Sequence, residues 1–526
     1  MPHVLVWGLL LAPTIRSMAR GWRPLGDDAA LAIGAWRALS LHPPLVGTAT
    51  GATGAAGTSD PGPLQYWLLG PFVHIDPGQG MILGSAVLGA AILSVTLRAL
   101  WRTSGPASAI IFSLAVADIA IVSPTPFVDP VWNSDFGFFW FMAFLGLAFV
   151  VGQGNVSYIP LLVFVASVTV DAHLMYLPSV AFVLVGTVVT GFLLRRTRDL
   201  RWLWWTAAVA FLCWVGPLYQ EFFDSHPNLS ALLDTSGFLH HDNTRTDGFV
   251  FGLRALSRAV SPFPIWDSPR PIAPLVAAGD VGQRSLLLCL VLPALLAIGI
   301  VAWKQKRSSL LSMCVVSLGA GIGVVALFSR IPYNFLLSFS WTNLPLWPVG
   351  ICMWLTFGFA AVTAYRSRFA ETTRRRPRIA VEIAAVAGVA AATVAGALVA
   401  MFPYQTQFVT DWGGVSRVKV MTASIERHVP LGPVGLGIRY NGSDYFQPAN
   451  DERGLSYLLL AAGWVPGMEP STNGSLGLPI HQRSPFVVFT ERNAQLTVTR
   501  FYRHYQSFWW VTPSPRSTKG AGVKEG

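Results

Sequence analysis

The chain has 526 residues, of which 52% are hydrophobic and 12% are charged. Soluble domains carry about 25% charged residues, so this composition excludes an ordinary soluble protein. Continuous apolar runs of about 20 residues indicate an α-helical membrane protein and exclude a β-barrel, whose strands alternate. The formal net charge is +11, but the basic residues gather in short loops between apolar runs, which requires no nucleic-acid partner. The four cysteines fall in apolar runs, without disulfide or zinc spacing.

Hydropathy predicts an all-α polytopic membrane protein with about eleven transmembrane helices. In chain order they cover residues 3–18, 80–101, 107–124, 136–152, 157–174, 176–194, 202–218, 284–303, 309–329, 344–364 and 379–402. Residues 1–402 are therefore expected to form one multi-span domain. Its two large loops lie at about 21–78 and 219–283.

Basic clusters in the loops predict the orientation of the chain. When the spans alternate, clusters at 98–102, 195–201, 304–307 and 366–378 fall on one side, which the positive-inside rule makes cytoplasmic. The N-terminus is then cytoplasmic, and both large loops and the C-terminal tail lie outside the plasma (inner) membrane. Arg16, Arg20 and Arg23 fall on the outer side, where snorkelling or anion binding accounts for them.

The polar tail after the last span predicts a second domain. Residues 403–513 contain three strand-like runs, VGLGIRY, PFVVFTE and QLTVTRFY, and one helix-like run, DERGLSYLLLAAGW. A length of roughly 100 residues suits a small domain. We therefore expect an extracytoplasmic α/β domain over 403–513. The small and polar residues 514–526 are expected to be disordered.

Two adjacent acids, Asp27 and Asp28, stand just after the first span and before the helix-like run AALAIGAWRAL. Ionisable residues at membrane depth are expensive and point to function. The structural alternative is that Asp28 caps that helix, where its carboxylate would satisfy free N–H groups and favour the helix dipole. That alternative accounts for Asp28 and leaves Asp27 for chemistry.

Further polar groups stand at the predicted outer ends of later segments. Asp60 precedes Pro-Gly-Pro and an aromatic run, which predicts a turn into an interfacial helix ending in solvated turn residues, His74 and Asp76. Candidate substrate-binding residues are Asp60, Asp171, His173, Gln220, Glu221, Arg245, Arg254, Arg258 and Arg330. The arginines offer bidentate contacts to a phosphate, or are simple surface charges. The structural alternative for Asp171 and His173 is a hydrogen-bonded interior pair, and for Glu221 a solvated start of a loop.

The segments that carry these acids resemble a known family. GDDA at 26–29, SDPGPLQYWLL at 59–69, DAHLMYLP at 171–178 and GPLYQEFFDSHPNLSALL at 216–233 look like segments of actinobacterial-type GT-C fold membrane glycosyltransferases. That class includes the dolichyl-phosphate-mannose-protein mannosyltransferases. The chain departs from the pattern where Asp60 replaces a histidine before Pro-Gly-Pro, and where Tyr219-Gln220-Glu221 replaces an acid. The resemblance covers about the first 240 residues.

The resemblance implies an enzyme of the glycosyltransferase class (EC 2.4 type) acting at the outer membrane face. A sugar would move, with inversion, from a polyprenyl-phosphate donor to an envelope glycan, lipid or protein acceptor. Asp27 would be the general base toward the acceptor hydroxyl, and Asp28 would cap the helix or orient the acceptor. The arginines would stabilise the departing phosphate. Some members of the class use a divalent metal, for which Asp27, Asp28 and Glu221 offer oxygen ligands, although no metal site is predicted here.

Two other functions stay open on the sequence. A transporter or flippase of a lipid-linked envelope precursor would place polar residues at the membrane midplane, often in broken helices. A non-catalytic envelope-assembly scaffold would display the tail and tolerate the loss of Asp27. The acids at the outer ends of spans favour the enzyme over the transporter.

Overall fold

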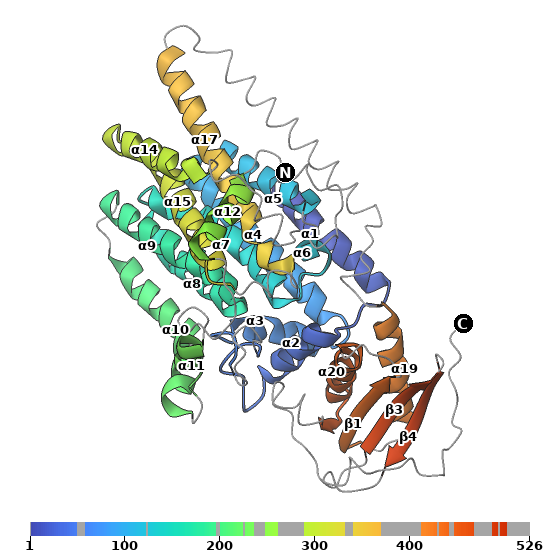
Figure 1. Ribbon diagram of the computed structural model, residues 1–526. Coiled ribbons are helices and arrows are strands. Elements are labelled where there is room, and N and C mark those ends of the chain that lie inside the picture. The colour runs from blue at the N-terminus through green and yellow to red at the C-terminus, as the bar shows by residue number, and fades with distance from the viewer. Residues whose placement is uncertain are drawn as a thin grey trace.

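The computed structural model describes residues 2–49, 58–122, 125–195, 200–224, 227–235, 248–260, 289–331, 340–369, 412–428, 431–440, 446–467, 486–492 and 495–501. Its membrane part is a bundle of helices, with a small mixed α/β unit beside one end of the bundle (Figure 1). Six described helices are long and apolar enough to cross a membrane, and three shorter helices are also apolar. The chain is thus a multi-pass helical membrane protein.

Ten of the eleven predicted spans correspond to helices, and the eleventh, 379–402, lies outside the described residues. The ten helices are α1 (Pro2–Ala19), α4 (Gly80–Ser104), α5 (Pro106–Val122), α7 (Asn133–Gly152), α8 (Ile159–Ala172), α9 (Leu177–Leu193), α10 (Arg201–Phe223), α14 (Val291–Lys304), α15 (Ser308–Phe328) and α17 (Leu346–Phe369). The short elements between them are α6 (Thr125–Val128), η1 (Val156–Tyr158), η2 (Leu174–Tyr176), α11 (Asn228–Thr235), α12 (Gly248–Val260) and η4 (Ser340–Asn343).

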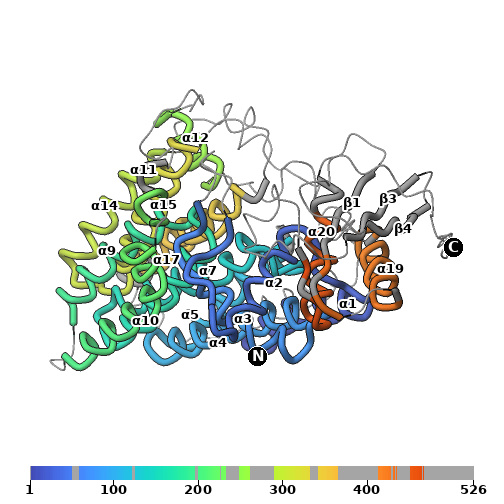
Figure 2. Tube along the Cα trace, turned by 90° about the horizontal axis from the view of Figure 1, so that it is seen from below, coloured from blue at the N-terminus to red at the C-terminus, as the bar shows by residue number. Residues whose placement is uncertain are grey.

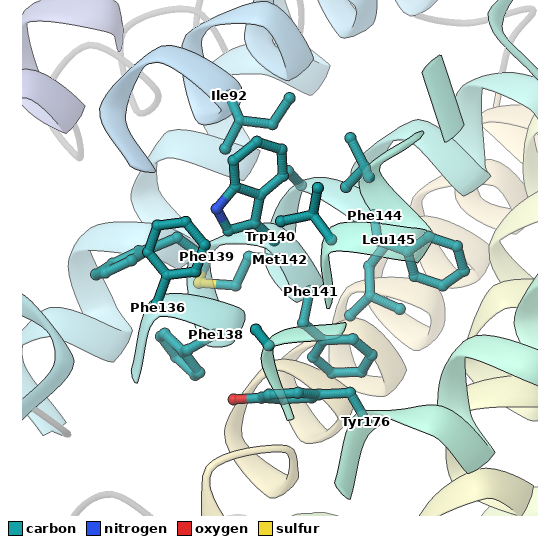
Figure 3. Close-up of a cluster of buried hydrophobic side chains, with 14 of the residues drawn as sticks. Ile92, Phe136, Phe138, Phe139, Trp140, Phe141, Met142, Phe144, Leu145 and Tyr176 are labelled. Carbon is teal, nitrogen blue, oxygen red and sulfur yellow. The ribbon is translucent and has the colours of Figure 1, made fainter. Parts of the chain in front are cut away.

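Helix α7 is the centre of the bundle. Nearly all of its residues are buried, and it packs against α4, α8, α9 and α15. Its run of aromatic side chains forms an interlocked cluster with Tyr176 (Figure 3). The hydroxyl of Tyr176 donates to the carbonyl of Ser134 at 2.8 Å, so this cluster also fixes the N-terminal turn of α7. That turn carries the buried polar residues Asn133 and Asp135.

Close contact between α9 and α15 depends on glycine. A Cβ added at Gly323 would lie 2.2 Å from the Cα of Ser179, and one at Gly319 would lie 2.9 Å from the Cα of Val183. Helices in membranes use such small residues to let their backbones approach. The Ser179 hydroxyl adds a hydrogen bond of 3.2 Å to the carbonyl of Ala320.

Two helices of the first loop cover one end of the bundle. Helix α2 (Gly26–Arg37) and helix α3 (Leu64–Ile75) pack side by side where α1 ends and α4 begins (Figure 1). The approach is close because a Cβ added at Gly34 would lie 2.5 Å from the ring of Tyr66. The expected helix after Asp60 is therefore present as α3. His74 stacks on Trp36 at 4.2 Å, and the Asp76 carboxylate accepts from the N–H groups of Gly78 and Gln79. Both side chains are exposed, as predicted, although His74 lies in the last turn of α3 and its ring packs on Trp36.

The C-terminal part forms a four-stranded sheet with two helices. Its elements are α19 (Trp412–His428), β1 (Pro433–Tyr440), α20 (Phe446–Ala461), β2 (Val465–Gly467), β3 (Phe486–Arg492) and β4 (Gln495–Phe501). The strand order is β2-β1-β3-β4, in which β1 is parallel to β2 and β3, and β4 is antiparallel to β3. The three strand-like runs of the sequence are found as β1, β3 and β4, and the helix-like run lies in α20 as far as Ala461. The limits of a domain at 403 and 513 stay a prediction, since those residues are outside the described ones.

Candidate active site

Asp28 lies in the first turn of α2 among other carboxylates. It is half-buried, and burial is the largest cause that raises its pKa well above the ordinary value, followed by the charges of Asp129, Asp27 and Asp135. Asp129 and Asp135 are buried, one just before α7 and the other in its first turn. A carboxylate whose pKa is raised by burial suits a general base. Among the acids of the first loop, Asp28 is the one that faces a cluster of other acids.

The first turn of α2 differs from the predicted capping arrangement. The N-cap residue is Leu25, with extended backbone and no side-chain hydrogen bond, and the two acids are the second and third residues of the helix. The prediction that Asp28 caps α2 is therefore wrong, because the helix begins at Gly26. Both carboxylates still lie in the first turn, where the helix dipole favours negative charge.

Asp27 is engaged by the C-terminal part of the chain. Its side chain is 54% exposed and accepts a hydrogen bond of 2.5 Å from Nη1 of Arg453, on helix α20. The sequence predicted Asp27 as the base and Asp28 as its helper. The surroundings of the two acids favour the opposite assignment, because Asp28 is the more desolvated of the two and Asp27 is engaged by an arginine.

Asp60 is held from three elements in a buried position. Its backbone pairs with residues 47 and 48 through hydrogen bonds of 2.9 and 2.7 Å, and its Oδ2 accepts from Asn133 Nδ2 at 3.0 Å. Burial raises the pKa of Asp60 to about 8, although Asn133 and the N–H of Leu174 oppose the rise. The neighbouring Ser59 is bonded through both backbone groups to the Asn228 side chain. Asp60 is thus part of the structural support of the first loop.

We expect Asp60 to make the folded protein less stable as pH rises. Its pKa is about 8 when folded and about 4 when unfolded, so the native state holds an extra proton between these values. Stability is therefore full below about pH 4 and is lost as pH rises to about 8. The variant Asp60→Asn should unfold at a higher temperature than the unchanged protein at pH 8, and the difference should shrink toward pH 5. Thermal unfolding in detergent measures this, with the exposed Glu426→Gln as control. A difference independent of pH would contradict the expectation.

Asp171 and His173 do not form the simple pair considered from the sequence. The carboxyl of Asp171 faces Gly62, where an added Cβ would lie 2.1 Å from Oδ2. His173 is the N-cap of η2, and its Nδ1 accepts from the N–H of Met175 at 3.2 Å. Both residues therefore fix the junction of α8 and α9 beneath the first loop, and the Asp171 carboxyl lies close to the segment that carries Asp60.

Gln220 and Glu221 hold the start of α11. Gln220 Oε1 accepts from the N–H of Asn228 at 2.9 Å, and the Glu221 carboxylate accepts from the N–H groups of Leu229 and Ser230 and from the Ser230 hydroxyl. Glu221 is therefore a helix cap rather than a loose loop residue. Through Asn228 and Ser59 this arrangement connects α10 to the first loop.

The described arginines that were predicted to bind phosphate lie on α12 and just after α15, two elements that pack together. Arg254 and Arg258 lie on α12, which packs mainly against α15 and α17, and Arg258 is buried. Arg330 is exposed just after α15, and Arg245 lies outside the described residues. Their role in binding a phosphate stays a prediction.

Within the described ranges, no group of three or more His, Cys, Asp or Glu side chains is placed to hold a metal ion. Asp27, Asp28 and Glu221 therefore do not come together as the ligand set considered from the sequence. Glu221 is already engaged by α11, and Asp27 by Arg453.

The sequence reading missed Asp129, Asn133 and Asp135. All three are buried, and they come from the short polar stretch DPVWNSD between two apolar runs. Three polar residues of this kind so close to a membrane span are the signal that could have identified them. The fold brings Asn133 to Asp60, and Asp129 and Asp135 near Asp28, across about 70 to 100 positions of sequence. The sequence alone does not indicate these pairings.

No protein-family model matches the chain, and no curated protein matches it in sequence. Among solved structures, the chain is similar to ArnT from Cupriavidus metallidurans, whose crystal structure has undecaprenyl phosphate bound. The two are 13% identical, the TM-score is 0.47, and the match covers 95% of each chain. The similarity is one of overall chain path, and the chemistry has to come from the site itself.

Proposed function

We propose that this chain is a GT-C-type membrane glycosyltransferase that moves a sugar from a polyprenyl-phosphate donor to an envelope glycan, lipid or protein acceptor. The observation that carries the proposal is the position of Asp28, a half-buried acid with a raised pKa beside Asp129 and Asp135 at the end of a membrane bundle. In the proposed arrangement a lipid-borne donor would reach this place from the bilayer, and an acceptor would reach it from the aqueous side.

In the proposed reaction Asp28 accepts the proton of the acceptor hydroxyl. The acceptor oxygen then attacks the anomeric carbon of the sugar, and the bond from that carbon to the phosphate oxygen breaks. The electron pair leaves with the polyprenyl phosphate, which is a good leaving group, and attack from the opposite face inverts the anomeric centre. General-base assistance of this kind contributes about 10²–10⁴-fold to the rate.

The orientation belongs to the same proposal. The α2–α3 end would face the outside of the plasma membrane, with the N-terminus cytoplasmic and the unit built on α19 and α20 extracytoplasmic. Arg98 and Arg102 lie at the C-terminal end of α4, and Arg195 follows the C-terminal end of α9. The positive-inside rule supports a cytoplasmic position for these ends. Labelling of cysteines introduced at residue 42, in the first loop, and at residue 306, in a basic loop, tests this orientation in intact cells. A reagent that does not cross the membrane should label residue 42 and not residue 306.

The deciding experiment is transfer of radiolabelled sugar from a panel of polyprenyl-phosphate sugars by the purified protein in lipid vesicles. The matched control is the double variant Asp27→Asn/Asp28→Asn, checked for the same expression and elution volume. Transfer that the double variant lacks would support the proposal. A folded protein that transfers no sugar from any donor would sink it and favour a flippase or a scaffold, which movement of a fluorescent lipid-linked precursor would tell apart.

A further inference from the structure

The C-terminal unit rests on the first loop through α20. Figure 2 shows α20 beside α2, and the close contacts lie at the N-terminal end of α2 and at Pro77, just after α3. The backbone of Gly26 has φ of +52°, and a Cβ added there would lie 2.7 Å from Oδ1 of Asn450. A Cβ added at Gly454 would lie 2.6 Å from the Leu25 side chain, and the Tyr457 hydroxyl donates to the carbonyl of Pro77 at 2.8 Å. Glycine at both contact points indicates that the two backbones are built to approach closely.

Arg453 lies in the middle of this contact and reaches the acid pair. Its Nη1 is 2.5 Å from Oδ1 of Asp27, and its side chain is 22% exposed. Asp451, two residues earlier on α20, pairs instead with Nε of Arg417 at 2.7 Å within the C-terminal unit. Two charged residues of α20 that are two positions apart therefore have different tasks: Asp451 holds α20 to α19, and Arg453 holds α20 to α2.

We propose that Arg453 is a positioning residue for the acid pair. It holds the Asp27 carboxylate at the contact of α2 with α20 and balances its charge, so that Asp28 remains as the carboxyl facing Asp129 and Asp135. The importance of this role for catalysis rests on the proposed function. The C-terminal unit would then be required for the correct protonation of the site, in addition to any contact it makes with an acceptor.

The charged and titratable groups around Asp28 come from α2, from the bundle and from the helices packed on α2. On α2 itself there are Asp27 and, in the last turn, Arg37, and from the bundle there are Asp129 and Asp135. The elements packed on α2 bring Tyr66 and His74 from α3, and Asp451, Glu452, Arg453 and Tyr457 from α20. Burial raises the pKa of both tyrosines, so they stay neutral, and Asp451 is paired with Arg417. Arg453 is thus the cation of α20 that contacts the acid pair.

Carbodiimide labelling tests the inference without any need for sugar transfer. A hydrophobic carbodiimide reacts with protonated carboxyls, so the pH midpoint of labelling at Asp28, read by mass spectrometry, reports its protonation. Arg453→Gln should raise the midpoint by about one pH unit, because the charge of Asp27 is no longer balanced. Arg453→Lys should keep most of the original value, and Asp27→Asn should lower the midpoint. Arg427→Gln removes the same charge from an exposed site on α19 and should change nothing.

A cross-link tests the contact itself. The Cβ of a cysteine at 26 would lie 3.5 Å from that of Asn450, within the range of a disulfide. Gly26→Cys/Asn450→Cys should therefore form a bond that changes mobility on a denaturing gel, while each single variant should not. No cross-link, or an Arg453→Gln midpoint equal to that of the unchanged protein, would overturn the inference. A shifted midpoint in a protein that transfers no sugar would overturn the proposed function instead and leave the role of Arg453 standing.

Discussion

Replacing Asp28 by Asn should reduce sugar transfer by about 10²–10⁴-fold, which is the contribution of a general base. Asp27→Asn should reduce it far less, because that side chain is more than half exposed and is held by Arg453. The Asn side chain has nearly the same volume as Asp and cannot accept the proton, so the fold should persist in both variants. Initial rates at saturating donor, with elution volume as a check on folding, measure the difference.

The pH dependence of sugar transfer should also distinguish the role of Asp28 from that of Asp27. Because burial and neighbouring carboxylates raise the pKa of Asp28, the rate should rise with pH through a range well above that of an ordinary aspartate, about 4. Asp27→Asn removes one of the charges that raise this pKa, so the acidic limb should move to lower pH. The matched control is Asp76→Asn, which keeps the oxygen that accepts from Gly78 and Gln79. An inactive Asp27→Asn beside an active Asp28→Asn would restore the assignment made from the sequence.

The membrane helices were predictable because hydrophobic length is a local property. Ten predicted spans coincide with helices to within a few residues, apart from α10, which continues to Phe223, and α14, which starts at Val291. The site depends on information that is not local. Asp27 and Arg453 are 426 positions apart, and Asp60 and Asn133 are 73 positions apart. No periodicity in either segment indicates its partner.

The roles of individual acids were predicted less well than their location. Asp27 and Asp28 are neighbours in the sequence and look alike, but the start of α2 at Gly26 turns one to α20 and the other to the bundle. Glu221 was a candidate ligand, and it caps α11 instead. The role of each acid depends on which free N–H group or arginine lies near its carboxylate. Which group lies near is decided by the residue at which the helix begins. Helix boundaries are the least certain part of a sequence reading.

Among the glycines of the first loop, Gly62 is expected to cost the most stability when it is replaced by alanine. A Cβ at this position would lie 2.1 Å from Oδ2 and 2.3 Å from Cγ of Asp171, and the Gly62 carbonyl is itself packed near Gly47. Asp171 is buried, so neither side has space to yield. Gly62→Ala should therefore cost about 1–3 kcal/mol or more of stability, as overpacking does in other cores. It should also reduce transfer, since Gly62 is two residues from Asp60 and displacement of this segment would break the bond to Asn133.

Thermal unfolding in detergent measures the cost, and Gly358→Ala is the matched control. Gly358 lies within α17 with nothing within 4 Å of an added Cβ, so its replacement should be neutral or slightly stabilising. If the clash with Asp171 is the cause, Asp171→Ala should relieve it, and Gly62→Ala/Asp171→Ala should be more stable than the sum of the single effects predicts. Simple additivity would show that the two residues do not contact each other. The first loop would then be held over the bundle by Asn133 and Asn228 rather than by the fit of Gly62 against Asp171.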